Sequence, residues 1–467
     1  MGTSQRIRDP LHDLIKFDEE PFESMLWEVI QTAPYQRLRR IKQLAFSEFV
    51  YPGATHTRFA HSIGVFHTAR QLMQIVERDL EKVDRWKADR ARVSIAAALL
   101  HDVGHGPFSH AFETVCEELQ LSTTKHEERS ASIIRNTEIG EILEKHQDRD
   151  FKIDVASLIA AGGPTDVYSS VVSSQFDADR LDYMRRDRLM TGTQHSEIDY
   201  TWLVENLKIA RLRSGIDDEP TDDIETFVLD QKAYYAAETY VLGLFQLYPT
   251  VFYHKATRCM EAIFTQLLMR IGTLVKDDDY DNIGLPKGHP IISFFRNPES
   301  LENFLELDDT TFWGAMSQLC SAPDECVSQL AGRLASRNLW KTFDLRLTIE
   351  KRLQGCEPDA VERTIANAQD EILAWSTDNS ANVPRAVLSS TKRDPYKVTP
   401  ISASPLNKVF IESGDELVEL REISPVVRAA KTYRLNRVYY ADEDNEALRQ
   451  IEKITESCIR EQENGTV

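Results

Sequence analysis

Apolar residues recur at helical spacing through most of the first 275 residues of the chain. The stretch from His61 to Val83 shows this most clearly, because one face of a helix would collect its apolar residues. These are Ile63, Phe66, Leu72, Ile75 and Val76. Further helices are predicted over 22–45, 91–100, 126–145, 155–161, 178–190 and 233–275. Alternating β-branched runs are rare in this part, so the pattern predicts a mainly helical core.

Other patterns predict turns and strands nearer the two ends. Residues 6–17 are extended and turn-rich, which predicts a small N-terminal hairpin, and Pro52-Gly53 predicts a turn. Short strands are expected at 408–411, 416–420 and 437–440, before a helix from Glu446. The predicted fold class is therefore mainly α, with an N-terminal hairpin and a mixed α/β C-terminal region.

Residues 276–290 mark a predicted boundary, because they hold two glycines and two prolines. We expect residues 1–275 to form a catalytic core and residues 276–467 to form a region for regulation or oligomerisation. Within that region the helical pattern runs to about Trp375, and a loop rich in serine, threonine and proline follows. The acidic stretches 217–225 and 277–281 are predicted to be solvated loops.

Composition and charge narrow the class of protein. Of 467 residues, 42% are hydrophobic and 28% are charged, as in ordinary globular proteins. The formal net charge of −20 disfavours a protein that coats nucleic acid, since phosphate contacts require a basic surface. The six cysteines form no CxxC pair, which favours a reducing compartment. No run has the length of a membrane span, so we expect a cytoplasmic protein that binds no membrane.

Residues able to do chemistry concentrate between Leu99 and His110, directly after an apolar run. A helix that ends in His101-Asp102 brings an imidazole and a carboxylate to the mouth of a core, where both need partners. Gly104 and Gly106-Pro107 are expected to break the helix. The turn would then present His105 and His110 to the same space.

Two imidazoles and two carboxylates are available as metal ligands: His61, His101, Asp102 and Asp179. Such a mixed set of nitrogen and oxygen donors suits Mn, Fe, Ni, Co or Zn better than Ca. Four protein ligands leave open positions on an octahedral ion for water and a phosphate oxygen, and Mg²⁺ could accompany the phosphates of a substrate.

The order of these residues resembles the HD-domain phosphohydrolases. Several segments resemble one branch, the dNTP triphosphohydrolases: Asp9 to His12, Gln36-Arg37-Leu38, Lys42-Gln43-Leu44, Tyr51 to Ala54, Arg58 to Ser62, His101 to His110 and Asp177 to Asp187. The resemblance covers roughly residues 6–190. Animal members join a sterile alpha motif to the HD domain, and no such motif precedes the match. The resemblance implies an HD-domain helical fold and the cleavage of dNTP to deoxynucleoside and inorganic triphosphate.

Site roles follow from the same resemblance. His110 and Glu113 are three residues apart and could share a helix face, and the family has its catalytic His–carboxylate pair here, usually with Asp. His126 and Arg58 would also act in catalysis. His105 and Arg180, which replaces a family lysine, would contact the phosphates. The sugar-binding residues would be Gln43 and Asp187 on the 3′-hydroxyl, Tyr183 against the ribose and Leu44 at the 2′ position.

The family also implies an effector site and assembly. Arg6, Arg8, Gln36 and Arg39, with Arg37 beside them, could bind a nucleotide effector. Gln31 stands at the position of the family's guanine-reading aspartate, which leaves the identity of an activator open. A homo-oligomer, from dimer to hexamer, is expected.

One departure keeps other functions open. Leu244 stands where the animal enzymes have a phosphate-binding arginine. The alternative is an HD-domain phosphohydrolase or nuclease that acts on another nucleotide or on single-stranded nucleic acid. A non-catalytic, nucleotide-sensing assembly is a third hypothesis.

Overall fold

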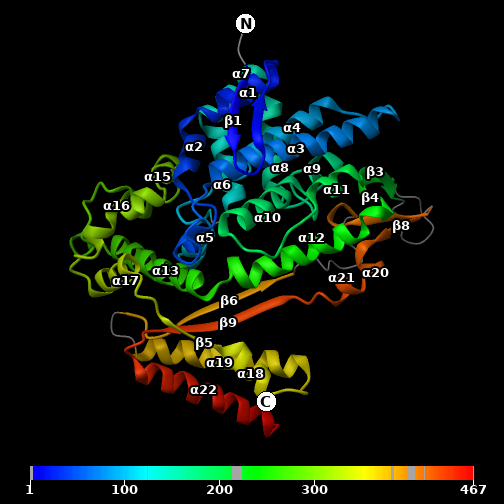
Figure 1. The fold of residues 1–467 in the computed structure, drawn as a ribbon. Helices are drawn as coiled ribbons and strands as arrows, with labels where there is room; N and C mark the ends of the chain where they lie inside the picture. The colour runs from blue at the N-terminus through cyan, green and yellow to red at the C-terminus, as the bar shows by residue number, and fades with distance from the viewer. Residues whose placement is uncertain are drawn as a thin grey trace. The chain divides into compact units, whose positions relative to one another are not determined.

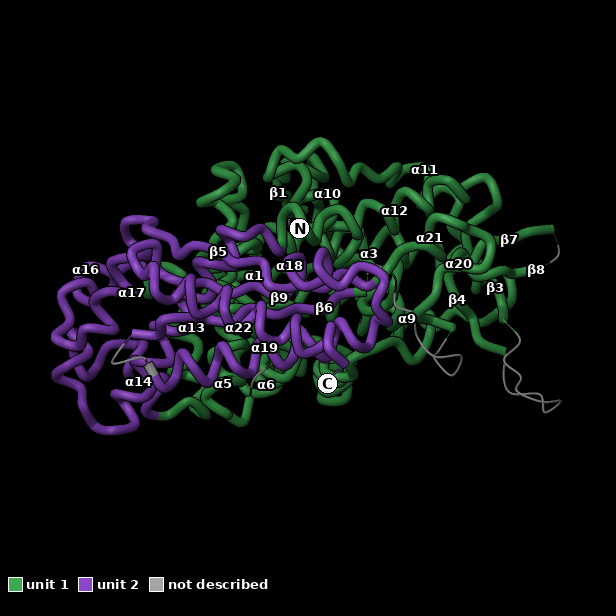
Figure 2. The backbone as a smooth tube through the Cα atoms, turned by 90° about the horizontal axis from the view of Figure 1, so that it is seen from below, with its two compact units in different colours: residues 1–252, 297–312, 394–431 green, residues 253–296, 313–393, 432–467 purple. Residues whose placement is uncertain are grey.

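Two units, interleaved along the chain, make up the fold of the computed structural model (Figure 2). Unit 1 holds residues 1–252, 297–312 and 394–431, and unit 2 holds residues 253–296, 313–393 and 432–467. The structure describes residues 4–123, 125–212, 223–379, 383–394, 396, 405–414 and 416–465. The functional division at residues 275 and 276 stays a prediction.

Unit 1 begins with the predicted hairpin, which the structure confirms (Figure 1). Strands β1 (Gln5–Asp9) and β2 (Asp13–Phe17) pair antiparallel. The helical stretch predicted over 22–45 is interrupted and ends early. The chain instead forms α1 (Pro21–Ile30), α2 (Ala33–Gln36) and two short 3₁₀ segments, Arg37–Arg40 and Ala45–Phe49.

The break after Arg40 has a tertiary cause. Lys42 bridges Thr57 in an antiparallel manner, Gln43 N–H donates to the His56 carbonyl, and Arg58 N–H donates to the Ile41 carbonyl. These bonds to a distant segment take the backbone groups that a continuing helix would have used.

Three long helices form the centre of unit 1, as predicted: α3 (Arg58–Glu81), α4 (Ala88–Leu100) and α10 (Ala178–Thr191). The helix predicted over 126–145 is two helices, because Thr137 has an extended backbone and its side chain caps the second one. The remaining α-helices of unit 1 are α5 (His110–Glu118), α6 (His126–Asn136), α7 (Glu138–His146), α8 (Arg149–Ala160), α9 (Val167–Ser170), α11 (Tyr200–Glu205), α12 (Tyr234–Leu247), α15 (Leu301–Leu305), α20 (Leu420–Ile423) and α21 (Pro425–Ala429).

A small sheet in unit 1 has the order β3 (Leu207–Leu212), β4 (Ile224–Leu229), β7 (Phe410–Ser413) and β8 (Glu416–Glu419). The pattern predicted β7 and β8 but not β3 and β4. Residues 217–222 of the first predicted acidic loop lie outside the described residues, whereas Ile224 and Glu225 belong to β4. The second, 277–281, is a turn followed by a short 3₁₀ segment, Tyr280–Asn282.

In unit 2, helices pack against an antiparallel sheet of order β5 (Lys341–Asp344), β9 (Tyr433–Tyr440) and β6 (Val387–Arg393). Strand β6 lies where the pattern predicted a loop. Helices α18 (Leu345–Arg352), α19 (Pro358–Asn379) and α22 (Asn445–Glu463) lie along one side of this sheet (Figure 1) and share its apolar core.

The helix predicted over 233–275 is interrupted. It ends as α12, continues through a π-helical turn (Tyr248–Phe252) that contains Pro249, and restarts as α13 (Lys255–Lys276). Unit 2 also contains α14 (Pro290–Arg296) and α17 (Glu325–Ser336), and α16 (Asp309–Leu319) has residues in both units. The mainly α fold class is confirmed. Among the described residues, no helix has the length and apolar content required to cross a membrane.

The glycines of the motif after α4 serve close packing. Helix α4 ends at Leu100, before Gly104 is reached, so the expectation that the glycines break the helix is wrong. A Cβ on Gly104 would overlap the carbonyl oxygen of His126 and the amide nitrogen of Ser130 at the start of α6. Gly104 therefore allows α6 to approach the motif.

We predict that Gly104→Ala lowers the free energy of unfolding by about 2 kcal/mol, because backbone atoms must move to admit the methyl group. Urea unfolding followed by circular dichroism measures the change. Gly163→Ala is the matched control, since its nearest heavy atom would be 3.9 Å away. Equal stability of the two variants would contradict the packing argument.

Candidate metal and phosphate site

Three elements of unit 1 bring the four predicted metal ligands together. His61 lies in the first turn of α3, His101-Asp102 follow α4, and Asp179 lies in the first turn of α10. His61 Nε2 is 3.0 Å from Asp179 Oδ1 and 3.7 Å from Asp102 Oδ2. His101 Nε2 is 3.3 Å from Asp102 Oδ1 and 3.9 Å from Asp179 Oδ1. Donor atoms of His61, His101 and Asp179 lie within 4.8 Å of one another, and Asp102 adjoins this group through its contacts with both imidazoles.

The two imidazoles are oriented by their other nitrogen atoms. His61 Nδ1 donates to Asp182 Oδ2 at 2.9 Å, and His101 Nδ1 donates to the Ala98 carbonyl at 2.9 Å. The Nε2 of each ring therefore faces the shared space. Burial opposes protonation of His61, but hydrogen bonds to Asp179 and Asp182 raise its pKa to about 10, so a metal ion would have to displace that proton. His101 Nε2 is buried and has no hydrogen-bond partner among the described residues. A lone pair and a carboxylate oxygen 3.3 Å apart repel each other unless a proton or a cation lies between them, so the donor set can hold a divalent metal ion.

Asp182, which sequence reasoning missed, anchors this arrangement. It is fully buried and also accepts from His12 Nε2 at 2.7 Å and from Arg186 Nε at 2.8 Å. Arg186 in turn donates to Asp9 Oδ2 at 2.8 Å. The network connects the N-terminal hairpin to His61, a predicted metal ligand. A Cβ on Gly64 would collide with the Asp182 carboxylate and the Arg186 guanidinium, so α3 needs glycine there.

The charges in this part of the site support an anionic ligand set. Burial opposes ionisation of Asp102, but Arg58 and the nearby imidazoles of His101 and His105 hold the pKa of its carboxyl well below its ordinary value. Burial also opposes ionisation of Asp179, whose pKa is lowered by His61. Both carboxylates are therefore charged at neutral pH and able to ligate a cation.

A second cluster adjoins the first through Asp102, whose Oδ1 lies 3.2 Å from His105 Nε2. Glu113 is its centre: Oε2 accepts from His110 Nδ1 at 2.8 Å, and Oε1 accepts from His126 Nδ1 at 2.6 Å. Burial would raise the pKa of Glu113, but the hydrogen bonds from both histidines lower it strongly. Burial would lower the pKa of His126, but the hydrogen bond and charge of Glu113, together with the charges of Glu127 and Asp102, raise it.

The second cluster fits proton transfer better than a metal ion. One donor atom from each of His105, His110, Glu113 and His126 lies within 4.8 Å of the others. The rings of His105 and His126, however, are stacked with centroids 3.8 Å apart and planes 18° apart. Lone pairs in the planes of two stacked rings run almost parallel and do not converge on one ion. His110 is exposed, so its Nε2 is accessible to a ligand.

The predicted sugar residues surround a histidine that sequence reasoning missed. Asp187 Oδ1 accepts from His56 Nε2 at 2.8 Å, and both side chains are buried. Gln43 Oε1 and His56 Nδ1 are buried atoms without a hydrogen bond within the described part of the chain. The Tyr183 ring meets Phe252 edge-on at 6.0 Å, and Leu44, next to Gln43, is half-buried. These two polar atoms therefore remain to be satisfied, and a ligand could supply the partners.

The two arginines predicted to face phosphates are paired with carboxylates. Arg58 Nη1 donates to Asp102 Oδ2 at 2.5 Å and Nε donates to Ser109 Oγ at 2.8 Å. Arg180 donates to Asp177 and to the Ser174 carbonyl. Both arginines therefore lie within the carboxylate-rich part of the site, adjacent in sequence or space to a predicted ligand.

The predicted effector residues come from two segments of unit 1, the hairpin and the segment that follows α1. Arg6 and Arg8 are exposed on the hairpin, where Arg8 pairs with Asp13. Arg39 is exposed. Its Nε donates to Gln36 Oε1 at 2.7 Å, and its guanidinium carbon lies 3.5 Å from the centre of the Phe59 ring. Arg37 is different: it is buried and donates to the Leu307 carbonyl at 2.7 Å. The structure therefore assigns Arg37 to the core, against the expectation that it could bind an effector.

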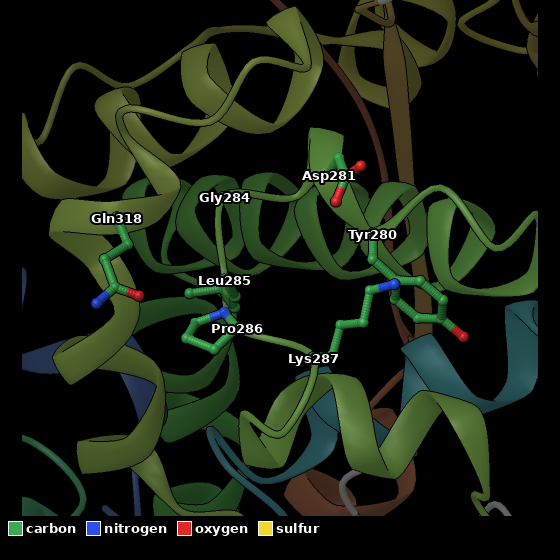
Figure 3. A pocket seen from close by; sticks show the side chains of 7 residues that line it. All are labelled: Tyr280, Asp281, Gly284, Leu285, Pro286, Lys287 and Gln318. Carbon is green, nitrogen blue, oxygen red and sulfur yellow. The ribbon is translucent and has the colours of Figure 1, made fainter.

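Leu244 is buried in α12, so the position of the missing arginine is an apolar core position. Unit 2 contains a separate pocket of about 430 Å³ (Figure 3). It is lined by Tyr280, Asp281, Gly284, Leu285, Pro286, Lys287 and Gln318. None of the predicted site residues contributes to it.

Two histidines and two aspartates lie beside an accessible His–Glu pair, an arrangement that could hold a metal ion next to a proton donor. The comparisons agree. The family model for the HD domain matches residues 58–184. The chain is 32% identical over 342 residues to the uncharacterized protein YwfO of Bacillus subtilis, which covers 73% of this chain and 72% of that protein. The chain therefore belongs to the HD-domain phosphohydrolase family.

Two further relatives extend the comparison. The deoxynucleoside triphosphate triphosphohydrolase SAMHD1 of Mus musculus is 24% identical over 398 residues, which is 78% of this chain and 57% of that protein. A phosphohydrolase of Bacteroides thetaiotaomicron has a crystal structure that superposes with a TM-score of 0.68 at 25% identity, covering 94% of this chain and 100% of that one.

We predict that Asp182→Asn weakens metal binding by about 10- to 100-fold, because His61 loses the carboxylate that orients it and increases its basicity. Isothermal titration with Mn²⁺ measures the affinity. Asp89→Asn is the control, since the Asp89 side chain is 98% exposed on α4. Unchanged Mn²⁺ affinity in a folded Asp182→Asn protein would contradict this role.

Proposed function

We propose that the protein is a metal-dependent dNTP triphosphohydrolase, which converts dNTP and water to deoxynucleoside and inorganic triphosphate. The observation that carries the proposal is the direct junction of two clusters: Asp102 faces both the other metal ligands and His105 of the histidine–glutamate cluster. Such a junction suits a substrate whose phosphates meet a cation on one side and a proton donor on the other.

His61, His101, Asp102 and Asp179 would hold the divalent ion, and their donor set suits Mn, Fe, Ni, Co or Zn. When bound, the ion polarises the α-phosphoryl group and lowers the pKa of water. Mg²⁺ would accompany the remaining phosphates.

The residues of the chain would then have separate roles in the reaction. Water adds to the α-phosphorus and releases a proton to solvent, and the bond from phosphorus to the 5′ oxygen breaks. His110 supplies the proton that the 5′ oxygen gains, since its Nδ1 is held by Glu113 and its Nε2 is left to face the substrate. Arg58, Arg180 and His126 would neutralise charge on the phosphates. His105 would contact them as a neutral imidazole, since burial and the nearby charges of Arg58 and His126 hold its pKa well below the ordinary value.

Recognition of the sugar would rest on Gln43 and Asp187. The buried Gln43 Oε1 without a partner can accept from a 3′-hydroxyl, and Asp187, held by His56, can do the same. Leu44 would crowd the 2′ position, and Tyr183 would pack against the deoxyribose. Apolar side chains in these positions would leave no room for the 2′-hydroxyl of a ribonucleotide.

The name of the Mus musculus relative supports dNTP as the substrate. We further propose a homo-oligomer, between a dimer and a hexamer, with a nucleotide effector near Arg6, Arg8, Gln36 and Arg39. Residues 276–467 would contribute regulation or assembly. The free cysteines favour a reducing compartment, and the cytoplasm is the proposed location.

The buried Leu244 favours a second candidate, because the animal enzymes carry a phosphate-binding cation at this position. This candidate is an HD-domain phosphohydrolase or nuclease that acts on another nucleotide or on single-stranded nucleic acid.

Product analysis separates the two candidates. We expect intact inorganic triphosphate and deoxynucleoside from dNTPs in the presence of Mn²⁺, with little reaction of NTPs or a short oligonucleotide. Ion-exchange chromatography identifies the products, and His101→Ala with Asp102→Ala is the inactive control. Pyrophosphate or cleaved oligonucleotide as the main product would support the second candidate, and turnover that survives the double substitution would exclude chemistry at this site.

A second prediction concerns the proton donor. Glu113→Gln should lower kcat by about 10²-fold or more, because His110 and His126 lose their shared carboxylate. The pKa of His126, which Glu113 raises, should shift downward in this variant. Steady-state kinetics and an NMR titration measure the two effects. Glu117→Gln, at an exposed position of the same helix, is the control, and a His126 pKa equal in both variants would contradict the assignment.

A further inference from the structure

The turn that leads into His110 has an unusual backbone. Phe108 and Ser109 have φ values of 54° and 58°, in the left-handed region that side chains other than glycine rarely adopt. Such a conformation persists only where surrounding contacts hold it. Since His110 follows directly at the start of α5, the contacts that hold this turn also place His110.

A carboxylate from a distant segment makes these contacts. Asp309, at the start of α16, is buried, and its Oδ1 accepts from Phe108 N–H at 2.8 Å. Its Oδ2 accepts from Lys42 N–H at 2.9 Å. Phe312, one turn later, meets the Phe108 ring edge-on at 5.2 Å. One side chain therefore bonds two backbone segments that lie more than 60 residues apart in sequence.

These two segments are the walls of the site. Lys42 precedes Gln43, on the sugar side, and Phe108 precedes the turn to His110, on the phosphate side. Ser109 closes the ring, because its Oγ donates to the Lys42 carbonyl at 3.3 Å and accepts from Arg58 Nε. The ring of contacts thus continues through Arg58 to the metal ligand Asp102.

We infer that Asp309 is a positioning residue that sets the separation of the sugar-binding segment from the strained turn carrying His110. The effect of Asp309 on turnover rests on the proposed function. Its hydrogen bonds to the Lys42 and Phe108 backbone do not depend on that proposal. Substitution should misplace His110 relative to the 5′ oxygen, and misplacement by even an ångström costs turnover more than binding.

Asp308 is a matched neighbour with a different role. Its Oδ1 accepts from Thr311 N–H at 2.9 Å and from Thr310 Oγ1 at 2.6 Å, and its Oδ2 pairs with Arg40. It caps the start of α16 and makes no hydrogen bond to the Lys42 or Phe108 backbone among those described. Asp308→Asn therefore perturbs the same helix but keeps the hydrogen bonds from the Lys42 and Phe108 amides to Asp309.

The surroundings of Asp309 make the strength of its two backbone hydrogen bonds dependent on pH. Burial raises the pKa of its carboxyl to about 7. The charged groups that face it are Asp308, Lys42 and Arg37. A proton on one oxygen weakens one of the two backbone hydrogen bonds, so both are strongest in the ionised state.

Hydrogen exchange of the Lys42 and Phe108 amides tests the hold directly. In Asp309→Asn we expect both amides to exchange at least tenfold faster than in wild type, while Asp308→Asn leaves them unchanged. With dNTP, Asp309→Asn should lower kcat by about 10- to 100-fold with a smaller change in KM. Equal exchange in the two variants, or an unchanged kcat in an active enzyme, overturns the inference.

Wild-type protein supplies a second test that needs neither the variant nor activity. Protection of the two amides, corrected for intrinsic exchange, should rise between about pH 6 and pH 8. Global stability should change in the opposite direction through this group, since a raised pKa of a folded carboxyl makes the free energy of unfolding fall as pH rises. Amides that exchange as freely as unbonded ones at pH 8 overturn the inference, even if dNTP hydrolysis is found. If the amides are protected but no dNTP is hydrolysed, only the proposed function fails.

Discussion

The geometry of the site depends on one buried charge, the carboxylate of Asp182. Burial opposes its ionisation, but Arg186, His12 and His61 hold its pKa well below the ordinary value. Its donors come from the N-terminal hairpin, from α3 and from α10 itself. Removing one partner of a buried ion pair costs roughly 3–5 kcal/mol. The requirement to keep this charge paired therefore docks the hairpin and orients His61, so the metal ligands are arranged by a residue outside the ligand set.

Strain is concentrated at the opposite end of the site. Two consecutive residues in the left-handed region, Phe108 and Ser109, cost on the order of 1–3 kcal/mol each. Stacking of Phe108 on Phe46, with centroids 4.2 Å apart, and the backbone bonds to Asp309 offset this cost. The glycines of the same motif do not relieve the strain, since Gly104 and Gly106 are required for close approach to α6 and to Phe112. The motif thus combines tight packing with a bent backbone just before His110.

Sequence patterns predicted the helices that keep one uninterrupted apolar face, such as α3. They failed where tertiary partners decide the backbone, as at Lys42, whose neighbours bond to residues 56–58. The predicted metal ligands could be identified from the sequence, because residue type and motif point to them. Asp182, His56 and Asp309 could not, because their importance lies in distances between segments far apart in sequence. Asp182 in particular lies three positions after Asp179 in a predicted helix, where nothing in the sequence distinguishes it from an ordinary charged residue of that helix.

Arg58 shows how the charges of the site are linked. It shares the Asp102 carboxylate with the imidazoles of His101 and His105, and the chain as a whole is acidic. An anion can approach only if local cations outweigh these carboxylates. A divalent cation held by Asp102 would compete with Arg58 for the same oxygen atoms and release part of the guanidinium charge. Phosphate affinity should therefore increase with metal occupancy, through the arginine rather than through the ion alone. Arg58 donates both to Asp102, a predicted metal ligand, and to Ser109 of the strained turn, so a change at either contact alters the surroundings of the other.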